Sequence, residues 1–451
     1  MRVGSLQMTT KYMTQLNRSY ANQTKLMEQS DGAKIHRPSD APIDYSKYLR
    51  YSTSYGENDQ YQYNIKTAVS WMKNTDAALV DMSDAMKTVV EKANQAQGTN
   101  TATDMAAIAS EMLVQVQQCV SDANTQVNGR YLFSGQADLI QPYVMSNDKY
   151  ERGLTKTLDD KQAEFFNDAS QSGDLTQMLT LEGTSVVNGE TVTETYYLNT
   201  LTGDVYTKEF VEEGYKLKVS QGQKHVKPGA VPTGDAVANI ADFDKVSKHF
   251  DERGVIKDES GVGKQYSNTT AIAGVTLTFA TVSQYIVTYQ GDRKQFSMVK
   301  ENGAAQPATD TVNAGGIDIA GSSIFDNKEA YPDGEYPGPS GSNAFNDLLT
   351  VVAMCEQDDS RWMSSDAKTL ANNSFNTVNI AQTVVAARQQ VYTDCEEMLV
   401  TQSETILEDI TTVHSTDVAK LAVEMMTAQT IYNLSLSVGS RVIPPTLADY
   451  L

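Results

Sequence analysis

The sequence predicts a mainly α-helical protein with a β-rich insert between two helical ends. Near both ends of the 451-residue chain, apolar residues recur at alternating spacings of three and four, which is typical of packed helices. From about residue 142 to 343 this period is replaced by short runs that alternate apolar and polar residues, as half-buried strands do. A Pro- and Gly-rich stretch over 332–341 then returns the chain to a helical pattern. We therefore expect a long antiparallel helical coiled-coil bundle, built from both termini, that carries an outer β domain.

The strongest helical signal lies over residues 61–97, where a strict 3,4 spacing predicts one long helix with a coiled-coil seam. Its members are Ile65, Ala68, Met72, Thr75, Leu79, Met82, Met86, Val89, Ala93 and Ala96. Gly98 breaks this helix, and Thr103 or Asp104 can cap the next one. That second helix continues the seam through Ala109, Leu113, Val116, Val120, Ala123 and Val127.

The two ends of the chain carry shorter and less regular stripes. The stripes comprise Leu6, Met13, Leu16, Tyr20 and Met27 at the start, Val384, Ala387, Val391 and Met398 further on, and Val418, Leu421, Met425, Ala428 and Tyr432 near the end. Ordinary bundle core would produce the same pattern. A helix that buries one narrow stripe is marginal by itself, however, so we expect the terminal helices to be completed by a neighbouring molecule.

The charge pattern also suits two ends that meet. The chain has 57 acidic and 36 basic residues, for a net charge of −21. The first 56 residues carry +4, whereas residues 346–451 carry −9. A chain this acidic is not expected to bind nucleic acid or an anionic membrane, because phosphate contacts need clustered Lys and Arg. No apolar run is long enough for a transmembrane helix, and the polar N-terminus predicts no cleaved signal peptide.

Within the insert, four short runs are predicted to be strands. They are Tyr215–Val219, Val275–Phe279, Tyr285–Tyr289 and Asn313–Gly321, with a turn at Gly203.

No catalytic or metal-binding constellation is visible in the sequence. The four histidines stand alone, and the three cysteines are far apart, so neither a zinc site nor a disulfide framework is expected. The segment Gly261-Val-Gly263-Lys264 lacks the glycine and the hydroxyl residue of a phosphate loop. We therefore expect no cofactor, no metal and no enzymatic activity.

One loop is more specific than the helical periods. Gly32 ends the first helix, Pro38 prevents it from resuming, and Ser39 or Asp40 can cap a new helix with Pro42 in its first turn. Together with Ile35, these residues predict a joint of fixed direction between two helical rods.

The joint resembles the "G-x-x-I-x-x-P-S-D-x-P" motif of the flagellin superfamily, which here reads Gly32, Ile35, Pro38, Ser39, Asp40 and Pro42. The segment Asn128-Gly129-Arg130-Tyr131-Leu132-Phe133-Ser134-Gly135 is similar to a motif of the hook–filament junction branch of that superfamily. Residues 289–292 with 315–325, and the end of the chain from Ala428 through Ile443 to Leu451, resemble further parts of these proteins.

The resemblance implies a structural part of the bacterial flagellum, secreted without a cleaved signal peptide. It implies three regions: terminal assembly helices of an inner tube layer (1–35 with 405–451), a helical bundle (36–140 with 346–404) and an outer insert (141–345). The implied partners are further copies in a helical lattice, other hook-associated proteins, hook protein, flagellin, and an export chaperone on the C-terminal helix. A filament flagellin is the alternative within this superfamily. A secreted adhesin, or an enzyme with a ligand-binding insert, is the alternative outside it.

Overall fold

The computed structural model describes residues 2–98, 100–167, 175–187, 189–221, 236–239, 250–251, 254–256, 267–292, 294, 296, 311–321 and 343–442. The chain forms two compact units, one of residues 1–67 with 392–451 and one of residues 68–391. The three-part division expected from the sequence is finer than this and stays a prediction.

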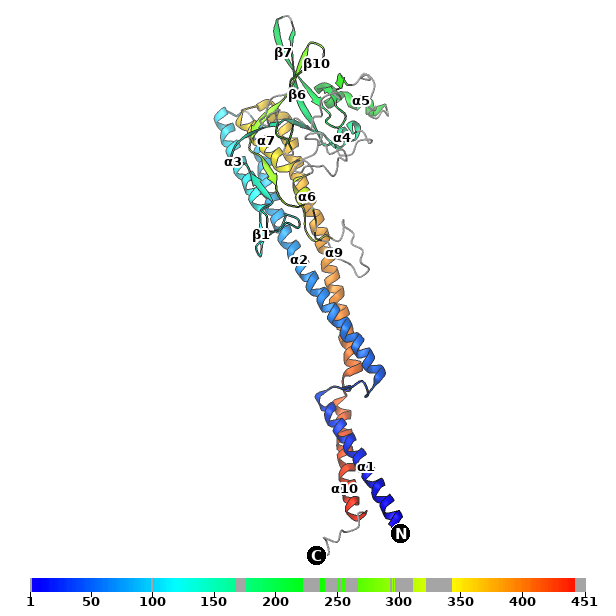
Figure 1. Cartoon of the computed structure of the whole chain (residues 1–451). Coiled ribbons are helices and arrows are strands. Elements are labelled where there is room, and N and C mark those ends of the chain that lie inside the picture. The colour runs from blue at the N-terminus through cyan, green and yellow to red at the C-terminus, as the bar shows by residue number, and fades with distance from the viewer. Residues whose placement is uncertain are drawn as a thin grey trace. The chain divides into compact units, whose positions relative to one another are not determined.

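Long helices form both ends of the chain (Figure 1). They are α1 (Arg2–Glu28), α2 (Pro42–Ala96), α3 (Ala102–Asp122), α7 (Ala344–Glu356), α9 (Lys368–His414) and α10 (Val418–Val442). Shorter helical segments are η1 (Gln29–Asp31), α4 (Asp160–Phe166), η2 (Phe210–Gly214), α5 (Tyr215–Ser220), α6 (Gly316–Ala320), α8 (Ser360–Trp362) and η5 (Met363–Ala367). The boundary between the two units falls within α2 and within α9.

The seam predicted on α2 is confirmed, because all ten of its residues are buried, with at most 7 % exposed. In the second unit α9 lies antiparallel to α2: Ser83 Oγ donates to Asn379 Oδ1 (2.8 Å), and Gln382 Nε2 donates to Asp76 Oδ1 (3.5 Å).

The stripe predicted on α9 is wrong. Val384, Val391 and Met398 are 40 %, 57 % and 62 % exposed, and Ala387 is exposed as well. The buried residues are Val378, Ala381, Val385, Tyr392, Leu399 and Ile406, whose heptad is offset by one residue from the predicted one. Helix α9 therefore carries two adjacent apolar stripes, of which the chain itself covers one.

Helix α3 begins with a capping box on Thr101 rather than on Thr103 or Asp104. The Thr101 hydroxyl accepts from the Asp104 backbone N–H, and the Asp104 carboxylate accepts from the Thr101 backbone N–H (3.1 Å) and hydroxyl (2.7 Å). Asp104 thus occupies the third helical position and completes the cap. These hydrogen bonds hold the pKa of Asp104 below its usual range.

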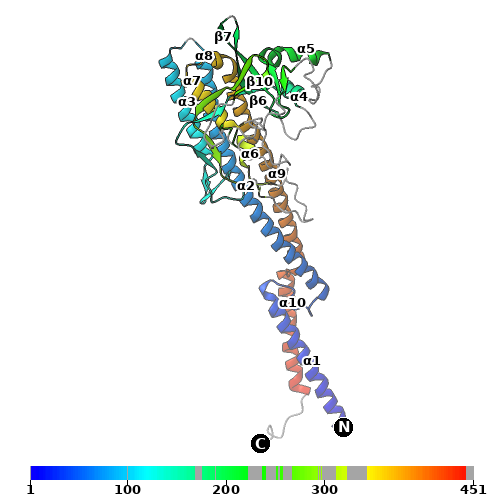
Figure 2. The same ribbon diagram turned by 45° about the horizontal axis from the view of Figure 1, so that its top comes forward.

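The insert contains the strands as well as short helices. The strands are β1 (Gln126–Val127), β2 (Arg130–Tyr131), β3 (Tyr143–Met145), β4 (Tyr150–Gly153), β5 (Thr155–Thr157), β6 (Gln177–Val187), β7 (Glu190–Leu198), β8 (Asp204–Thr207), β9 (Ala238–Asn239), β10 (Ser267–Ile272), β11 (Val275–Phe279), β12 (Thr281–Gln284) and β13 (Val287–Tyr289). Seven of them form one sheet, in the order β10-β11-β6-β7-β8-β9 with β5 beside β6. Two-stranded pairs β4–β12 and β3–β13 connect the sheet to the helices (Figure 2).

Alternating residues of this sheet pack into two cores. On one face Leu179, Leu181 and Leu198 pack with Phe250 and Phe279. On the other face Met178, Tyr197 and Tyr206 pack with Phe165 and Phe166. Because side chains point alternately to opposite faces of a strand, β6 and β7 contribute to both cores.

Two of the predicted strands are helices instead. Residues Tyr215–Ser220 form α5, of which Tyr215 packs into the aromatic core while Leu217 is 62 % exposed. Residues Gly316–Ala320 form α6. The strand predicted at Val275–Phe279 and the turn at Gly203, whose φ is +77°, are confirmed, whereas only Val287–Tyr289 of the Tyr285–Tyr289 run is a strand.

Candidate functional site: the joint, the terminal helices and the insert anchor

The first part of the joint is a tight end to α1. Gly32 adopts a left-handed backbone (φ +94°), and its N–H donates to the carbonyl of Gln29. The Asp31 carboxylate accepts from the Ala33 N–H and bonds His36 Nε2, both at 2.9 Å. The Ala33 N–H and His36 hold the pKa of Asp31 below its usual range. Gly32 therefore ends the helical segment as predicted.

Asp40 shapes the joint, although not as the helix cap that the sequence suggested. Its Oδ2 accepts from the N–H groups of His36 (3.3 Å) and Arg37 (3.0 Å), so the carboxylate closes the turn that precedes α2. Partial desolvation opposes ionisation, but these two N–H groups and nearby basic residues outweigh it and lower the pKa of Asp40. Ser39 is exposed, and α2 begins at Pro42, as expected.

The returning chain is bonded to this joint. The Lys34 N–H donates to the carbonyl of His414 (2.6 Å), and the Thr416 N–H donates to the carbonyl of Gly32 (2.9 Å). The His414 ring stacks on Tyr48 at 4.2 Å between centroids. Ile35 is buried, with 3 % exposed, whereas Pro38 is exposed. The link between α9 and α10 is thereby held to the link between α1 and α2.

Helices α1 and α10 pack along one narrow seam. Leu26, Leu421 and Ala428 are buried there, with Met425 partly buried against them. Tyr12 Oη donates to the carbonyl of Ser435 (2.9 Å), and Tyr20 contacts Tyr432 with ring centroids 6.1 Å apart. The ion pairs described in this unit join residues of the same end, so apolar and aromatic contacts carry the pairing of the two ends.

Much of the apolar surface of these two helices is uncovered. Met13, Tyr20, Met27 and Val418 of the predicted stripes are 46 %, 60 %, 56 % and 68 % exposed. Leu16 is half-buried, and the side chain of Leu6 and the segment 443–451 lie outside the described residues. On α10 a second apolar face, opposite the seam, comprises Val423, Met426, Ile431, Leu434 and Val438, all at least 50 % exposed.

The motif at residues 128–135 forms a hairpin that locks onto β13. Asn128 (φ +54°) and Gly129 (φ +78°) form the two-residue turn between β1 and β2, in the backbone region that such hairpins require. Arg130 pairs with Asp138 at 2.9 Å, and Tyr131 is half-buried in β2.

The end of the same motif contacts the segment after β13. The carbonyl of Phe133 accepts from Tyr289 Oη (2.9 Å), and the carbonyl of Ser134 accepts from the Asp292 N–H (2.9 Å). Phe133 is fully buried. Gly135 has a φ of +70°, and a Cβ atom there would overlap the carbonyl oxygen of Asp292. The two segments singled out in the sequence are therefore two sides of one contact.

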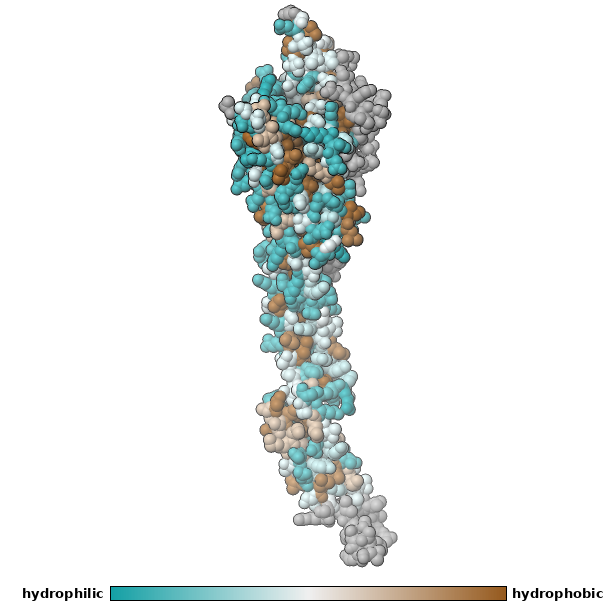
Figure 3. All heavy atoms as spheres, turned by 90° about the vertical axis from the view of Figure 1, so that its left-hand side faces the viewer, coloured by the Kyte–Doolittle hydropathy of each residue, from teal (hydrophilic) through white to brown (hydrophobic). Residues whose placement is uncertain are grey.

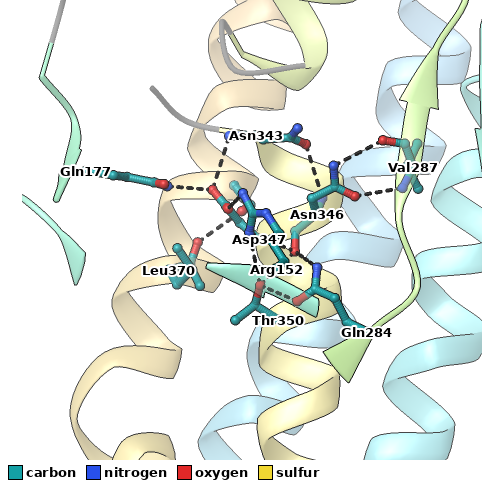
Figure 4. A network of polar contacts seen from close by, with 10 residues as sticks. Arg152, Gln177, Gln284, Val287, Asn343, Asn346, Asp347, Thr350 and Leu370 are labelled. Carbon is teal, nitrogen blue, oxygen red and sulfur yellow. Dashed lines mark hydrogen bonds and ion pairs between the residues drawn. The ribbon is translucent and has the colours of Figure 1, made fainter. Parts of the chain in front are cut away.

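A buried polar network anchors the insert to α7 (Figure 4). Arg152 of β4 is 1 % exposed and pairs with Asp347 of α7 at 3.1 Å. Gln177 Nε2 (2.7 Å) and the Asn343 N–H (3.1 Å) donate to the other carboxylate oxygen. Burial raises the pKa of Asp347, and Arg152 with these donors opposes the rise. An ion pair buried this deeply fixes one arrangement of its elements, because either partner left alone would be costly.

The remaining members of the network bind the neighbouring strands. Arg152 Nη1 donates to Thr350 Oγ1 (3.1 Å), which in turn donates to Gln284 Oε1 of β12 (2.7 Å). Asn346 accepts from the N–H of Val287 (2.7 Å) and donates to its carbonyl (3.0 Å), as a further strand would. Sequence reasoning missed this site. Its signal is the polar series 343, 346, 347 and 350 on an otherwise apolar helix.

Chemistry of other kinds is not found in these parts of the chain. No group of three or more His, Cys, Asp or Glu residues among the described ones is placed to hold a metal ion. None of the described helices combines the length and the apolar character that a membrane span needs.

Comparisons with known proteins identify the N-terminal region. Residues 3–138 match the family model described as the bacterial flagellin N-terminal helical region. The resemblance to the flagellin superfamily is confirmed. Flagellar hook-associated protein 3 of Salmonella typhimurium is 30 % identical over 165 residues, which are 35 % of this chain and 52 % of that protein. The protein of the same name from Escherichia coli is 30 % identical over 156 residues, 34 % of this chain and 49 % of its own length.

The chain therefore spans about half the length of the curated relatives that it matches. Among solved structures, flagellar hook associated protein-3 of Legionella pneumophila aligns with 80 % of this chain and 98 % of its own, at 11 % identity and a TM-score of 0.37. The flagellar junction protein FlgL of the same organism aligns with 76 % and 98 %, at 12 % identity and a TM-score of 0.34.

Proposed function

We propose that this chain is a structural, non-enzymatic component of the bacterial flagellum that joins the hook to the filament. It is exported without a cleaved signal peptide and assembles through its N- and C-terminal helices. The curated relatives support the junction role over that of a filament subunit, since both are named flagellar hook-associated protein 3.

The observation that carries the proposal is the two-sided apolar character of α10. One face, with Leu421 and Ala428, packs on α1, and the opposite face, with Met426 and Leu434, is 66 % and 59 % exposed at these residues. Large exposed apolar patches mark surfaces that bind other proteins. Assembly buries this face against neighbouring copies or the adjoining hook and filament subunits, and an export chaperone covers α10 beforehand.

Deletion of the gene tests the junction role. Cells without the chain should make hooks that carry no filament and should shed flagellin into the medium. Normal filaments on the deleted strain would refute the proposal, and hooks with shortened filaments would favour a filament subunit instead.

A point substitution tests the part of the proposal that concerns α10. Met426→Glu places a charge on the exposed apolar face and should abolish complementation of the deletion, because an unpaired charge would have to be buried on assembly. Gln429→Glu is the matched control, since it adds the same charge on an exposed flank of the same helix. Equal motility of the two variants would exclude this face as an assembly surface.

A further inference from the structure

Within the second unit, α9 has an exposed face that carries no charge. Between Thr369 and Thr393 the only charged residue is Arg388. The exposed face comprises Asn376, Ile380, Thr383, Val384, Ala387 and Val391. Ile380 and Val391 are 65 % and 57 % exposed, so these branched side chains stand out from the helix. We call these six residues the α9 face.

Helix α3 has a second uncharged face, with small residues and hollows. Its exposed residues at 3,4 spacing are Thr103, Ala107, Ser110, Val114, Gln117 and Ser121, which we call the α3 face. A hollow of about 220 Å³ between α3 and α7 and one of about 280 Å³ between α3 and α2 lie on either side of Ser110, which lines both. Hydrophobic residues gather between hydrophilic ones on this side of the molecule (Figure 3).

The two faces lie on opposite flanks of the bundle, with α2 between α3 and α9 (Figures 1 and 2). One copy therefore cannot use them to cover each other. The exposed surface of α2 beside them is charged, through Lys73, Asp81, Asp84 and Lys87. The faces span about 22 Å on α9 and about 27 Å on α3, at about 1.5 Å per residue, so their lengths match.

We propose that the α9 face of one copy docks on the α3 face of the next copy. This inference rests on the proposed function, because it names the contact between successive copies in the assembled structure. The occupant of each face is a second copy of this chain, since the chain itself provides both the branched, protruding surface and the hollowed one. Such a contact joins two different surfaces, so it continues from copy to copy instead of closing into a symmetric dimer.

Electrostatics favours this pair of faces over any other region of the bundle. Each copy carries a net charge of −21, so copies repel one another at low salt. Contact between two uncharged faces desolvates no ion and opposes no like charges at the point of closest approach. The docked helices place Ile380 and Val384 beside the hollows that flank Ser110.

Directed cross-linking of the purified, concentrated full-length chain tests the contact. In a Cys395→Ser background, where the other two cysteines are buried, one chain carries both Ser110→Cys and Val384→Cys. Oxidation should then link successive copies into a ladder of trimers and larger species. Either substitution alone should yield dimers at most, because each chain then offers one accessible thiol.

The matched control pairs Val384→Cys with Val186→Cys, a 72 % exposed apolar position at the end of β6. It should give no ladder. A double variant that cross-links no further than this control overturns the proposal. The result is separable from the proposed function, because the deletion phenotype does not depend on which face joins the copies.

A charge substitution gives a second measurement. Val384→Glu should raise the concentration needed for self-association about tenfold or more by sedimentation, while Val186→Glu should leave it unchanged. Association of the unmodified chain should strengthen as salt rises from about 0.05 to 0.5 M, because screening shortens the repulsion between acidic copies. Weakening by salt, or equal association of the two variants, contradicts an uncharged interface.

Discussion

Replacing Arg152 with methionine should destabilise the second unit by about 3–5 kcal/mol, the usual effect of removing one partner of a buried ion pair. The substitution leaves the Asp347 carboxylate buried with only Gln177 and the Asn343 N–H as donors. Thr350 keeps its bond to Gln284 but loses its donor from the guanidinium. The loss therefore comes mainly from the unpaired charge.

Urea unfolding followed by tryptophan fluorescence measures this effect in the right unit, because Trp71 and Trp362 are the only tryptophans and both lie in residues 68–391. With a slope of about 3 kcal/mol per M, the midpoint should fall by about 1 M or more. Lys149→Met is the matched control. It breaks the exposed Lys149–Glu356 pair (2.6 Å), which also links the insert to α7, and should cost at most about 1 kcal/mol.

Two further measurements separate the ion pair from general packing. Arg152→Met combined with Asp347→Asn should recover at least half of the lost stability, since no buried charge remains. In Arg152→Met alone, burial holds the folded-state pKa of Asp347 above its unfolded value of about 3.9, so stability should rise as pH falls from 7 through that raised pKa. Equal losses in the single and double variants, with no recovery in acid, would refute the reasoning.

Three other predictions concern backbone geometry, capping and the joint. Gly135→Ala should cost several kcal/mol in the same urea assay, because its Cβ would overlap a carbonyl, whereas Gly129→Ala has open space and should cost about 1–2 kcal/mol for the left-handed backbone alone; equal costs would contradict the contact. Thr101→Ala should cost about 1 kcal/mol through loss of the capping box, and no change in the urea midpoint would exclude that role. The lowered pKa of Asp40 stabilises the joint above about pH 4, and this is lost as pH falls through the folded-state value, so pepsin cleavage within 32–41 should accelerate between about pH 4 and 2. Asp40→Asn should abolish that pH dependence.

Sequence periodicity predicted α2 well because a single stripe runs along its seam from Ile65 to Ala96, so only one face could be buried. It failed on α9 because two apolar stripes run side by side there. Val385 and Tyr392 face the chain, whereas Val384 and Val391 do not, and only the packed partner decides between registers one residue apart. The predicted inner stripe is the one that now forms the α9 face.

Short segments failed for a different reason. Tyr215, Leu217 and Val219 alternate as a strand would, yet burial of Tyr215 alone against the aromatic core allows a helix. In the joint, Gly32 and Pro42 act as predicted because their backbone limits are intrinsic to those residues. Asp40 could serve any nearby N–H group, and the fold of the loop offered those of His36 and Arg37 first.

The hydrogen bond between Tyr12 and Ser435 joins positions separated by 423 residues in the sequence. Closing a flexible chain costs free energy that grows only with the logarithm of its length, so doubling the intervening segment adds about 0.6 kcal/mol. The pairing of the two ends therefore places almost no thermodynamic limit on the size of what lies between them. Insertions or deletions in the outer insert can change its bulk greatly while the terminal helices keep the same partner.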